Sequence, residues 1–271
     1  MDPWSPQPAP PRGDAILDLA PPPADARIPY GPGPWQFGDL RLPAGPGPHP
    51  LAIGLHGGFW RARYDLQHLG HLCAALATAG IATWSLEYRR VGNAGGGYPG
   101  TLDDVAQGAA FASQLAARCP LDLGRVVVFG HSAGGQLALW LGSRAPFDLR
   151  AVIGLAALSD LAQASALRLG DGIVDEFLGG GPAEVPVHYA AASPRARLPL
   201  GQRQILLHGQ RDDTVPFAMS VDYVAAAIAA GDAASLIAVP EAGHFELIDP
   251  RLPEGRRVVQ CLHDVLCAPT P

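Results

Sequence analysis

A serine placed between glycines follows an apolar run in this chain. Residues 126–135 read Val-Val-Val-Phe-Gly-His-Ser-Ala-Gly-Gly, and a helix-forming stretch begins at Gln136. A G-x-S-x-G pattern between a predicted strand and a predicted helix indicates a sharp turn that lifts the Ser132 hydroxyl above the edge of a sheet. Side chains at Gly130 and Gly134 would collide with the neighbouring strand and helix. The alternative interpretation is a glycine-rich turn in which the serine only caps the helix.

A serine hydroxyl is a weak nucleophile unless a base accepts its proton and an acid orients that base. Two later segments offer these groups. Residues 208–216 read His-Gly-Gln-Arg-Asp-Asp-Thr-Val-Pro, and residues 242–245 read Ala-Gly-His-Phe. The order serine, acid, histidine predicts Ser132 as the nucleophile, Asp212 as the acid and His244 as the base. A histidine base predicts that activity rises with pH as the imidazole loses its proton.

Two adjacent carboxylates compete for the role of the acid. Asp212 lies four residues after His208 and four before Pro216, a spacing that favours it over Asp213. Asp213 then caps a turn or the following helix. The plain structural interpretation of both residues is a capping pair in front of the helix that starts near Pro216.

A second glycine pair lies after another predicted strand, where residues 56–60 read His-Gly-Gly-Phe-Trp. Acyl transfer needs backbone N–H donors aimed at the developing oxyanion. We expect the N–H groups of Gly57, Gly58 and Ala133 to form this oxyanion hole, with His56 bracing the loop through a backbone hydrogen bond.

Four residues near these motifs are candidates for the substrate pocket: Phe59, Trp60, His131 and Phe245. For Phe59 and Trp60 the alternative is a place in the hydrophobic core, and for His131 it is a structural role.

The composition excludes several classes of function. The 271 residues suit one large domain, and the net charge of −6 gives no electrostatic case for nucleic acid or for an anionic membrane surface. All 19 basic residues are arginines, which excludes a lysine base or Schiff base. His68 and His71 lie three residues apart without a third ligand, so we expect no metal and no cofactor. Four scattered cysteines, no signal peptide and no apolar run of membrane length predict a cytoplasmic protein.

The chain divides into a Pro-rich arm over residues 1–34 and one domain over residues 35–271, with an excursion or cap at about 158–203. Within the domain, predicted strands alternate with predicted helices. The strands cover residues 35–42, 51–55, 81–88, 126–129, 151–157, 205–208 and 235–239, and the helices cover 65–79, 101–117, 136–141, 217–230 and 252–266. Such alternation predicts an α/β fold with a mostly parallel sheet and helices on both faces. Binding sites in this architecture lie beyond the carboxyl ends of the strands, where the residues above fall.

Taken together, these motifs resemble those of the α/β-hydrolase superfamily over residues 35–267, more narrowly its hormone-sensitive-lipase and kynurenine-formamidase-like branch. The matching stretches are residues 56–60, 87–89, 130–135, Asp212 with Val215 and Pro216, and 243–245. The resemblance implies a Ser132, Asp212 and His244 triad with Gly57, Gly58 and Ala133 around the oxyanion. The oxyanion motif, which ends in Trp60, is closer to the H-G-G-x-W pattern of arylformamidases than to the H-G-G-G pattern of lipase-like esterases, because Phe59 replaces a third glycine.

We therefore expect a serine esterase that cleaves small carboxylic esters through an acyl-enzyme. An arylformamidase that cleaves a formamide such as N-formylkynurenine is the first alternative. A non-catalytic ligand receptor on the same fold is the second, although no triad member is missing from the chain. The expected partner is a small ester or amide.

Overall fold

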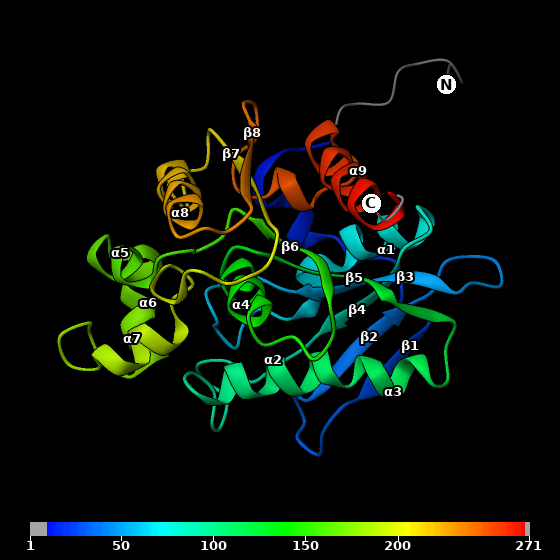
Figure 1. Ribbon diagram of the computed structural model, residues 1–271, viewed down its shortest axis with the longest axis horizontal. Coiled ribbons are helices and arrows are strands. Elements are labelled where there is room, and N and C mark those ends of the chain that lie inside the picture. The colour runs from blue at the N-terminus through cyan, green and yellow to red at the C-terminus, as the bar shows by residue number, and fades with distance from the viewer. Residues whose placement is uncertain (1–9, 269–271) are drawn as a thin grey trace.

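In the computed structural model, which describes residues 10–268, eight strands form one sheet (Figure 1). The strands are β1 Ala26–Pro29, β2 Phe37–Arg41, β3 His49–Leu55, β4 Ala82–Leu86, β5 Leu121–His131, β6 Leu149–Leu155, β7 Gln204–Gly209 and β8 Ala234–Val239. Their order across the sheet is β1-β2-β4-β3-β5-β6-β7-β8. Strand β2 is antiparallel to both neighbours, whereas every pairing from β4 to β8 is parallel. The predicted mostly parallel sheet is confirmed.

Helices cover both faces of the sheet. The α-helices are α1 Gly70–Thr78, α2 Gly100–Ala110, α3 Ala112–Ala116, α4 Ala133–Gly142, α5 Leu161–Ala166, α6 Leu169–Leu178, α7 Pro186–Ala192, α8 Phe217–Ala229 and α9 Pro253–Cys267. Short 3₁₀-helices are η1 Gly13–Asp18, η2 Leu66–Leu69, η3 Arg195–Arg197 and η4 Glu246–Ile248. Figure 1 shows α1 and α9 together on one side of the sheet and α2 and α3 on the other.

The central strand β5 is apolar on both faces because both faces are covered. Val126 and Val128 pack with α2 and α4, whereas Val127 and Phe129 pack with α1 and α9. Alternate side chains of a strand point to opposite faces, so a doubly covered strand reads as a continuous apolar run. The Val-Val-Val-Phe sequence that precedes the serine is such a strand.

Two predicted helices differ from their observed form. The helix expected over residues 65–79 begins as a 3₁₀-turn, because the Asp65 carboxylate accepts the Gln67 N–H at 2.9 Å and caps it. The helix expected over residues 101–117 is divided at Phe111 into α2 and α3.

The Pro-rich arm contributes to the sheet. Residues 26–29 form β1, which pairs with β2, and the preceding turn η1 packs Ile16 into the core, where it is 2% exposed. Residues 1–9 of the expected arm and 269–271 of the expected domain lie outside the described residues.

The expected excursion holds α5, α6, α7 and η3, which gather at one end of the molecule (Figure 1). Residues 168 and 170–172 have positive φ, so α6 begins with a left-handed kink. None of the described helices combines the length and the hydropathy that crossing a bilayer requires.

Candidate active site

The turn between β5 and α4 holds Ser132 in a strained backbone conformation, with φ 58° and ψ −119°. A Cβ atom at Gly130 would lie 2.1 Å from the carbonyl oxygen of Gly134 in the helix. A Cβ at Gly134 would lie 2.0 Å from the carbonyl oxygen of Leu55 in β3. A side chain at either glycine would therefore collide with the helix or with the neighbouring strand, as expected from the sequence. A positive φ at a residue other than glycine costs about 1–3 kcal/mol and is concentrated at functional sites.

Asp212 and His244 form a buried pair. The Nδ1 of His244 lies 2.7 Å from Oδ2 of Asp212, whose side chain is 0% exposed. Oδ1 of the same carboxylate accepts the N–H groups of Thr214 and Val215 at 2.9 and 2.8 Å. Because an ionised carboxylate only accepts hydrogen bonds, Nδ1–H of His244 is the donor, and the lone pair of the neutral ring lies on Nε2.

The surroundings of Asp212 keep it ionised. Burial raises the pKa of this carboxyl, but hydrogen bonds from His208 and His244 outweigh burial and hold the pKa well below its usual range. Nε2 of His208 lies 3.1 Å from Oδ2, and its Nδ1 lies 2.7 Å from the hydroxyl of Ser220. Asp213 is exposed and accepts the hydroxyl of its neighbour Thr214 at 3.2 Å. The structure therefore pairs Asp212, and not Asp213, with the histidine.

Two further histidines, His131 and His68, form a chain of hydrogen bonds that ends at the backbone of His244. Nε2–H of His131 donates to the backbone carbonyl of His244 at 2.9 Å, and the two rings lie 4.5 Å apart. The Nδ1 of His131 is then an acceptor for Nε2–H of His68 at 2.7 Å. Burial, followed by repulsion from His244, lowers the pKa of His131 to about 3, and burial lowers that of His68 well below its usual value. Both rings are neutral.

The oxyanion loop is held by its first residue. Nδ1–H of His56 donates to the carbonyl of Gly57 at 2.8 Å, which is the backbone brace expected from the sequence. Its Nε2 lies 3.1 Å from the buried carboxylate of Glu87, and its ring stacks on Tyr88 at 4.3 Å. The Tyr88 hydroxyl also donates to the carbonyl of His56 at 2.6 Å. Residues 87–89 are among the motifs that match in the sequence, but the sequence assigns Glu87 no role, because nothing in its spacing connects it to residue 56.

The predicted oxyanion donors lie at the two turns that meet beside the serine. Gly58 has φ +105°, and a Cβ there would lie 2.5 Å from Tyr64, so the position requires glycine. A Cβ at Gly57 would lie 2.9 Å from the carbonyl oxygen of His131. Within residues 10–268, no protein acceptor takes the N–H of Gly57, Gly58 or Ala133. These three N–H groups are therefore available to a ligand.

Ser132 and His244 line the same cavity, which has a volume of about 250 Å³. Phe59 and Phe245 also line it, as expected. The other lining residues are Leu17, Gly58, Arg61, Arg63, Tyr64, His68, Gly170, Asp171 and Thr214.

The other two pocket candidates, Trp60 and His131, lie behind the cavity wall. Both are 0% exposed, and neither lines the cavity. The indole N–H of Trp60 donates to Gln136 at 3.1 Å, and its ring stacks on Phe177 at 4.4 Å. The expected pocket role of Trp60 is therefore corrected to a core role, because α6 covers its ring. His131 acts on His244 instead of lining the pocket.

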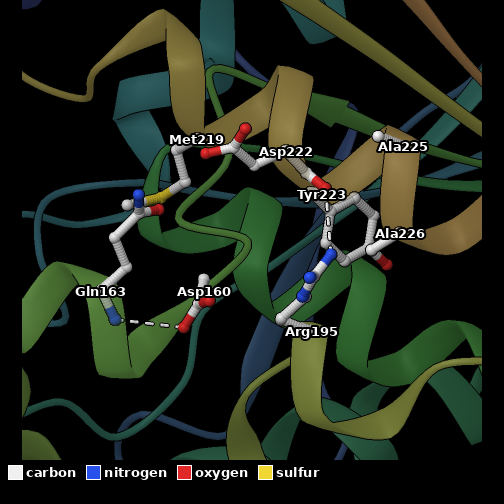
Figure 2. Close-up of a pocket in the computed structure, with 8 residues that line it drawn as sticks. All are labelled: Asp160, Gln163, Arg195, Met219, Asp222, Tyr223, Ala225 and Ala226. Atoms are coloured by element: carbon white, nitrogen blue, oxygen red, sulfur yellow. Dashed lines mark hydrogen bonds between the residues drawn. The ribbon is translucent and has the colours of Figure 1, made fainter.

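A larger cavity of about 490 Å³ lies between α5 and α8 (Figure 2). Its charged groups already serve local structure. Asp160 accepts the N–H of Gln163 at 3.1 Å as the cap of α5, and Arg195 donates to the backbone carbonyl of Asp222 at 2.9 Å. None of the predicted catalytic residues lines it.

Among residues 10–268, no group of three or more His, Cys, Asp or Glu side chains has the arrangement of a metal site. The four cysteines are unpaired thiols, including Cys261 and Cys267 near the end of α9.

The amino-acid sequence was compared with those of known protein families. Residues 39–226, which include the oxyanion loop, the serine turn and Asp212, match the BD-FAE family. The chain belongs to this family. The BD-FAE match ends within α8, so His244 lies beyond it. No curated protein matches the sequence.

Solved structures share the fold of this BD-FAE chain. Esterase B from Lactobacillus rhamnosis HN001 is 18% identical with a TM-score of 0.78, and the alignment covers 94% of this chain and 90% of that one. A butyrate-bound thermophilic esterase from Thermogutta terrifontis is 19% identical with a TM-score of 0.72, covering 92% and 97%. A bifunctional GH43-CE protein from Bacteroides eggerthii is 20% identical with a TM-score of 0.73 over 88% of this chain, which spans 37% of that protein. The fold is that of the α/β-hydrolases.

Proposed function

We propose that this protein is a serine hydrolase that cleaves small carboxylic esters through an acyl-enzyme. The observation that carries the proposal is the strained serine at residue 132, which lines one cavity with a histidine whose Nδ1 is bonded to a buried carboxylate. The esterases from Lactobacillus rhamnosis and Thermogutta terrifontis share this fold, which supports the same chemistry.

In the proposed reaction, Ser132 attacks the ester carbonyl while Nε2 of His244 accepts its proton. The N–H groups of Gly57, Gly58 and Ala133 are the donors to the developing oxyanion, and each such donor contributes about 3–4 kcal/mol in comparable enzymes. His244 then gives the proton to the departing alcohol. A water attacks the acyl-enzyme by the same steps and releases the acid. Asp212 fixes the ring tautomer and stabilises the imidazolium.

The test is Ser132→Ala, because the proposal has no other nucleophile. We expect kcat for p-nitrophenyl acetate to fall on the order of 10⁶-fold, as in other triads. A fluorophosphonate probe should label the wild-type protein at residue 132 and leave the variant unlabelled. Undiminished turnover by the variant, or a wild-type protein that forms no adduct, would remove the proposal; the second result would favour a ligand receptor.

The arylformamidase alternative was based on Trp60, and that side chain lies in the core. We therefore propose an ester rather than a formamide as the substrate. A kcat/KM for N-formylkynurenine above that for short-chain p-nitrophenyl esters would reverse this choice.

A further inference from the structure

The cavity that Ser132 and His244 line is the proposed catalytic cavity. The side chains that line it carry a net charge opposite in sign to that of the whole protein. The chain carries a net charge of −6, yet the permanently charged groups that line the cavity are two guanidiniums, Arg61 and Arg63, and one carboxylate, Asp171. The remaining lining residues are apolar or uncharged polar residues and two histidines, of which His68 is held neutral by burial. A local excess of cationic charge beside the serine attracts an anionic ligand.

Arg61 is committed to the protein itself. Its Nη2 donates to the carbonyl of Gly170 at 2.8 Å. Gly170 packs on Phe59, since a Cβ at Gly170 would lie 2.8 Å from that ring. Arg61 therefore holds the left-handed segment at the start of α6 over the cavity.

Arg63 is exposed and stacks its guanidinium on the ring of Tyr64, with 4.8 Å between Cζ and the ring centroid. Within residues 10–268, Arg63 is not among the arginines seen in an ion pair with a carboxylate, which include Arg12, Arg27, Arg89, Arg90, Arg125, Arg211 and Arg251. Stacking fixes the plane of the guanidinium and leaves its N–H edge for a bidentate acceptor.

Arg63 also connects the cavity with an adjoining groove of about 180 Å³. The groove shares Leu17, Tyr64 and His68 with the catalytic cavity. It is also lined by Asp65, whose carboxylate accepts the backbone and side-chain N–H groups of Gln67 at 2.9 and 3.3 Å. A substrate that extends from Ser132 into the groove passes Arg63. Arg63 is therefore placed to contact a charged group of the substrate that lies away from the ester carbonyl attacked by Ser132.

We propose that Arg63 binds a carboxylate carried by the substrate, so that the preferred substrates are esters that bear a separate anionic group. This inference rests on the proposed ester hydrolysis and names its substrate class. A hydrogen-bonded pair of guanidinium and carboxylate has the geometry for this recognition, and a neutral analogue of the substrate lacks it.

The experiment compares matched esters that differ only in charge. On the alcohol side the pair is 3-acetoxybenzoate and its methyl ester, and on the acyl side it is mono-4-nitrophenyl adipate and its methyl ester. For each pair, the ratio of kcat/KM for the anionic over the neutral ester is measured in the wild type and in Arg63→Gln. Dividing one ratio by the other cancels the intrinsic reactivity of the esters.

We expect Arg63→Gln to lower this ratio about ten-fold for at least one pair, in keeping with a charged hydrogen bond at a partly exposed site. Arg63→Lys should recover part of the lost ratio, because lysine keeps the positive charge but lacks the two parallel N–H donors of a guanidinium. Arg144→Gln is the matched control, since Arg144 stacks on Trp140 at 5.0 Å in the same manner but outside the cavity. Added salt should reduce the wild-type ratio by screening.

The outcomes separate this inference from the proposed function. If Arg63→Gln leaves the ratio unchanged for both pairs while the neutral esters are hydrolysed in a Ser132-dependent way, the carboxylate site is wrong and the esterase stands. If Arg144→Gln lowers the ratio as much as Arg63→Gln, the effect is one of overall charge and the site is also wrong. If the wild type hydrolyses none of the four esters, both proposals fail together.

Discussion

At the residue scale, the choice between two neighbouring aspartates is made by hydrogen bonds that arise from distant parts of the chain. Asp212 receives His244 from the loop after β8, together with His208 from the end of β7. Asp213 is exposed, and its carboxylate accepts the hydroxyl of its neighbour Thr214. A carboxylate can orient a catalytic imidazole only if it is fixed by such contacts, so the two residues should differ greatly when each is replaced.

Asp212→Asn should lower kcat for p-nitrophenyl acetate by about 10⁴-fold, because an amide at this position favours the wrong imidazole tautomer. Asp213→Asn is the control and should stay within about two-fold of the wild type, since exposed substitutions away from the site have small effects. Equal losses in the two variants would contradict the assignment of Asp212 as the acid.

At the element scale, the N-terminal 3₁₀-helix η1 contributes to the wall of the cavity that Ser132 and His244 line. Leu17 lines the cavity, and the preceding Ile16 is buried against the α1 and α9 side of the core. The carboxylate of Glu246 accepts the N–H of Gly13 at 2.9 Å and the N–H of Gly243 at 3.0 Å. This one side chain joins the arm to the loop that carries His244.

Ile16→Ala should loosen η1, because it removes the apolar anchor of the arm. We expect the free energy of unfolding to fall by about 2 kcal/mol, the lower end for a buried Ile to Ala change, and trypsin to cleave after Arg12 faster. Leu19→Ala is the matched control, since Leu19 is 42% exposed and its truncation should cost little. Urea denaturation and timed proteolysis measure both effects. An Ile16→Ala protein as stable and as protease-resistant as Leu19→Ala would show that the arm is not anchored there.

At the scale of the whole molecule, the neutral pair His68 and His131 makes stability depend on pH. In the native protein the pKa of each lies below the ordinary value of 6.5, at about 3 for His131. Below pH 6.5 the unfolded chain binds a proton at each histidine and the native protein does not, so acid favours unfolding. The stability from His131 is therefore complete above pH 6.5 and is lost progressively as the pH falls toward 3.

His131→Gln should flatten the pH dependence of the unfolding free energy between pH 6.5 and 5. One proton contributes up to about 1.4 kcal/mol per pH unit, so the slope should decrease by roughly 1 kcal/mol per unit. The exposed His263 is the control, and His263→Gln should keep the wild-type slope. Urea denaturation at several pH values gives the slopes. A His131→Gln slope equal to that of the wild type would show that the ring is already protonated in the native protein.

The sequence alone determined the features of this protein that depend on neighbouring residues. An uninterrupted apolar run is typical of a strand covered on both faces, and the glycines around Ser132 report a turn too tight for side chains. The order of motifs along the chain placed serine, acid and histidine each behind a strand of the sheet. These are short-range constraints, which periodicity and turn chemistry record directly.

The tertiary structure decided which residues meet. It paired His244 with Asp212, buried Trp60 under α6, and brought His68 beneath His131 from a segment 63 residues away. It also made a sheet strand from residues 26–29, a short segment of the Pro-rich arm that is held by pairing with β2. Such contacts depend on how whole elements pack, and packing energy is spread over residues that lie far apart in the chain.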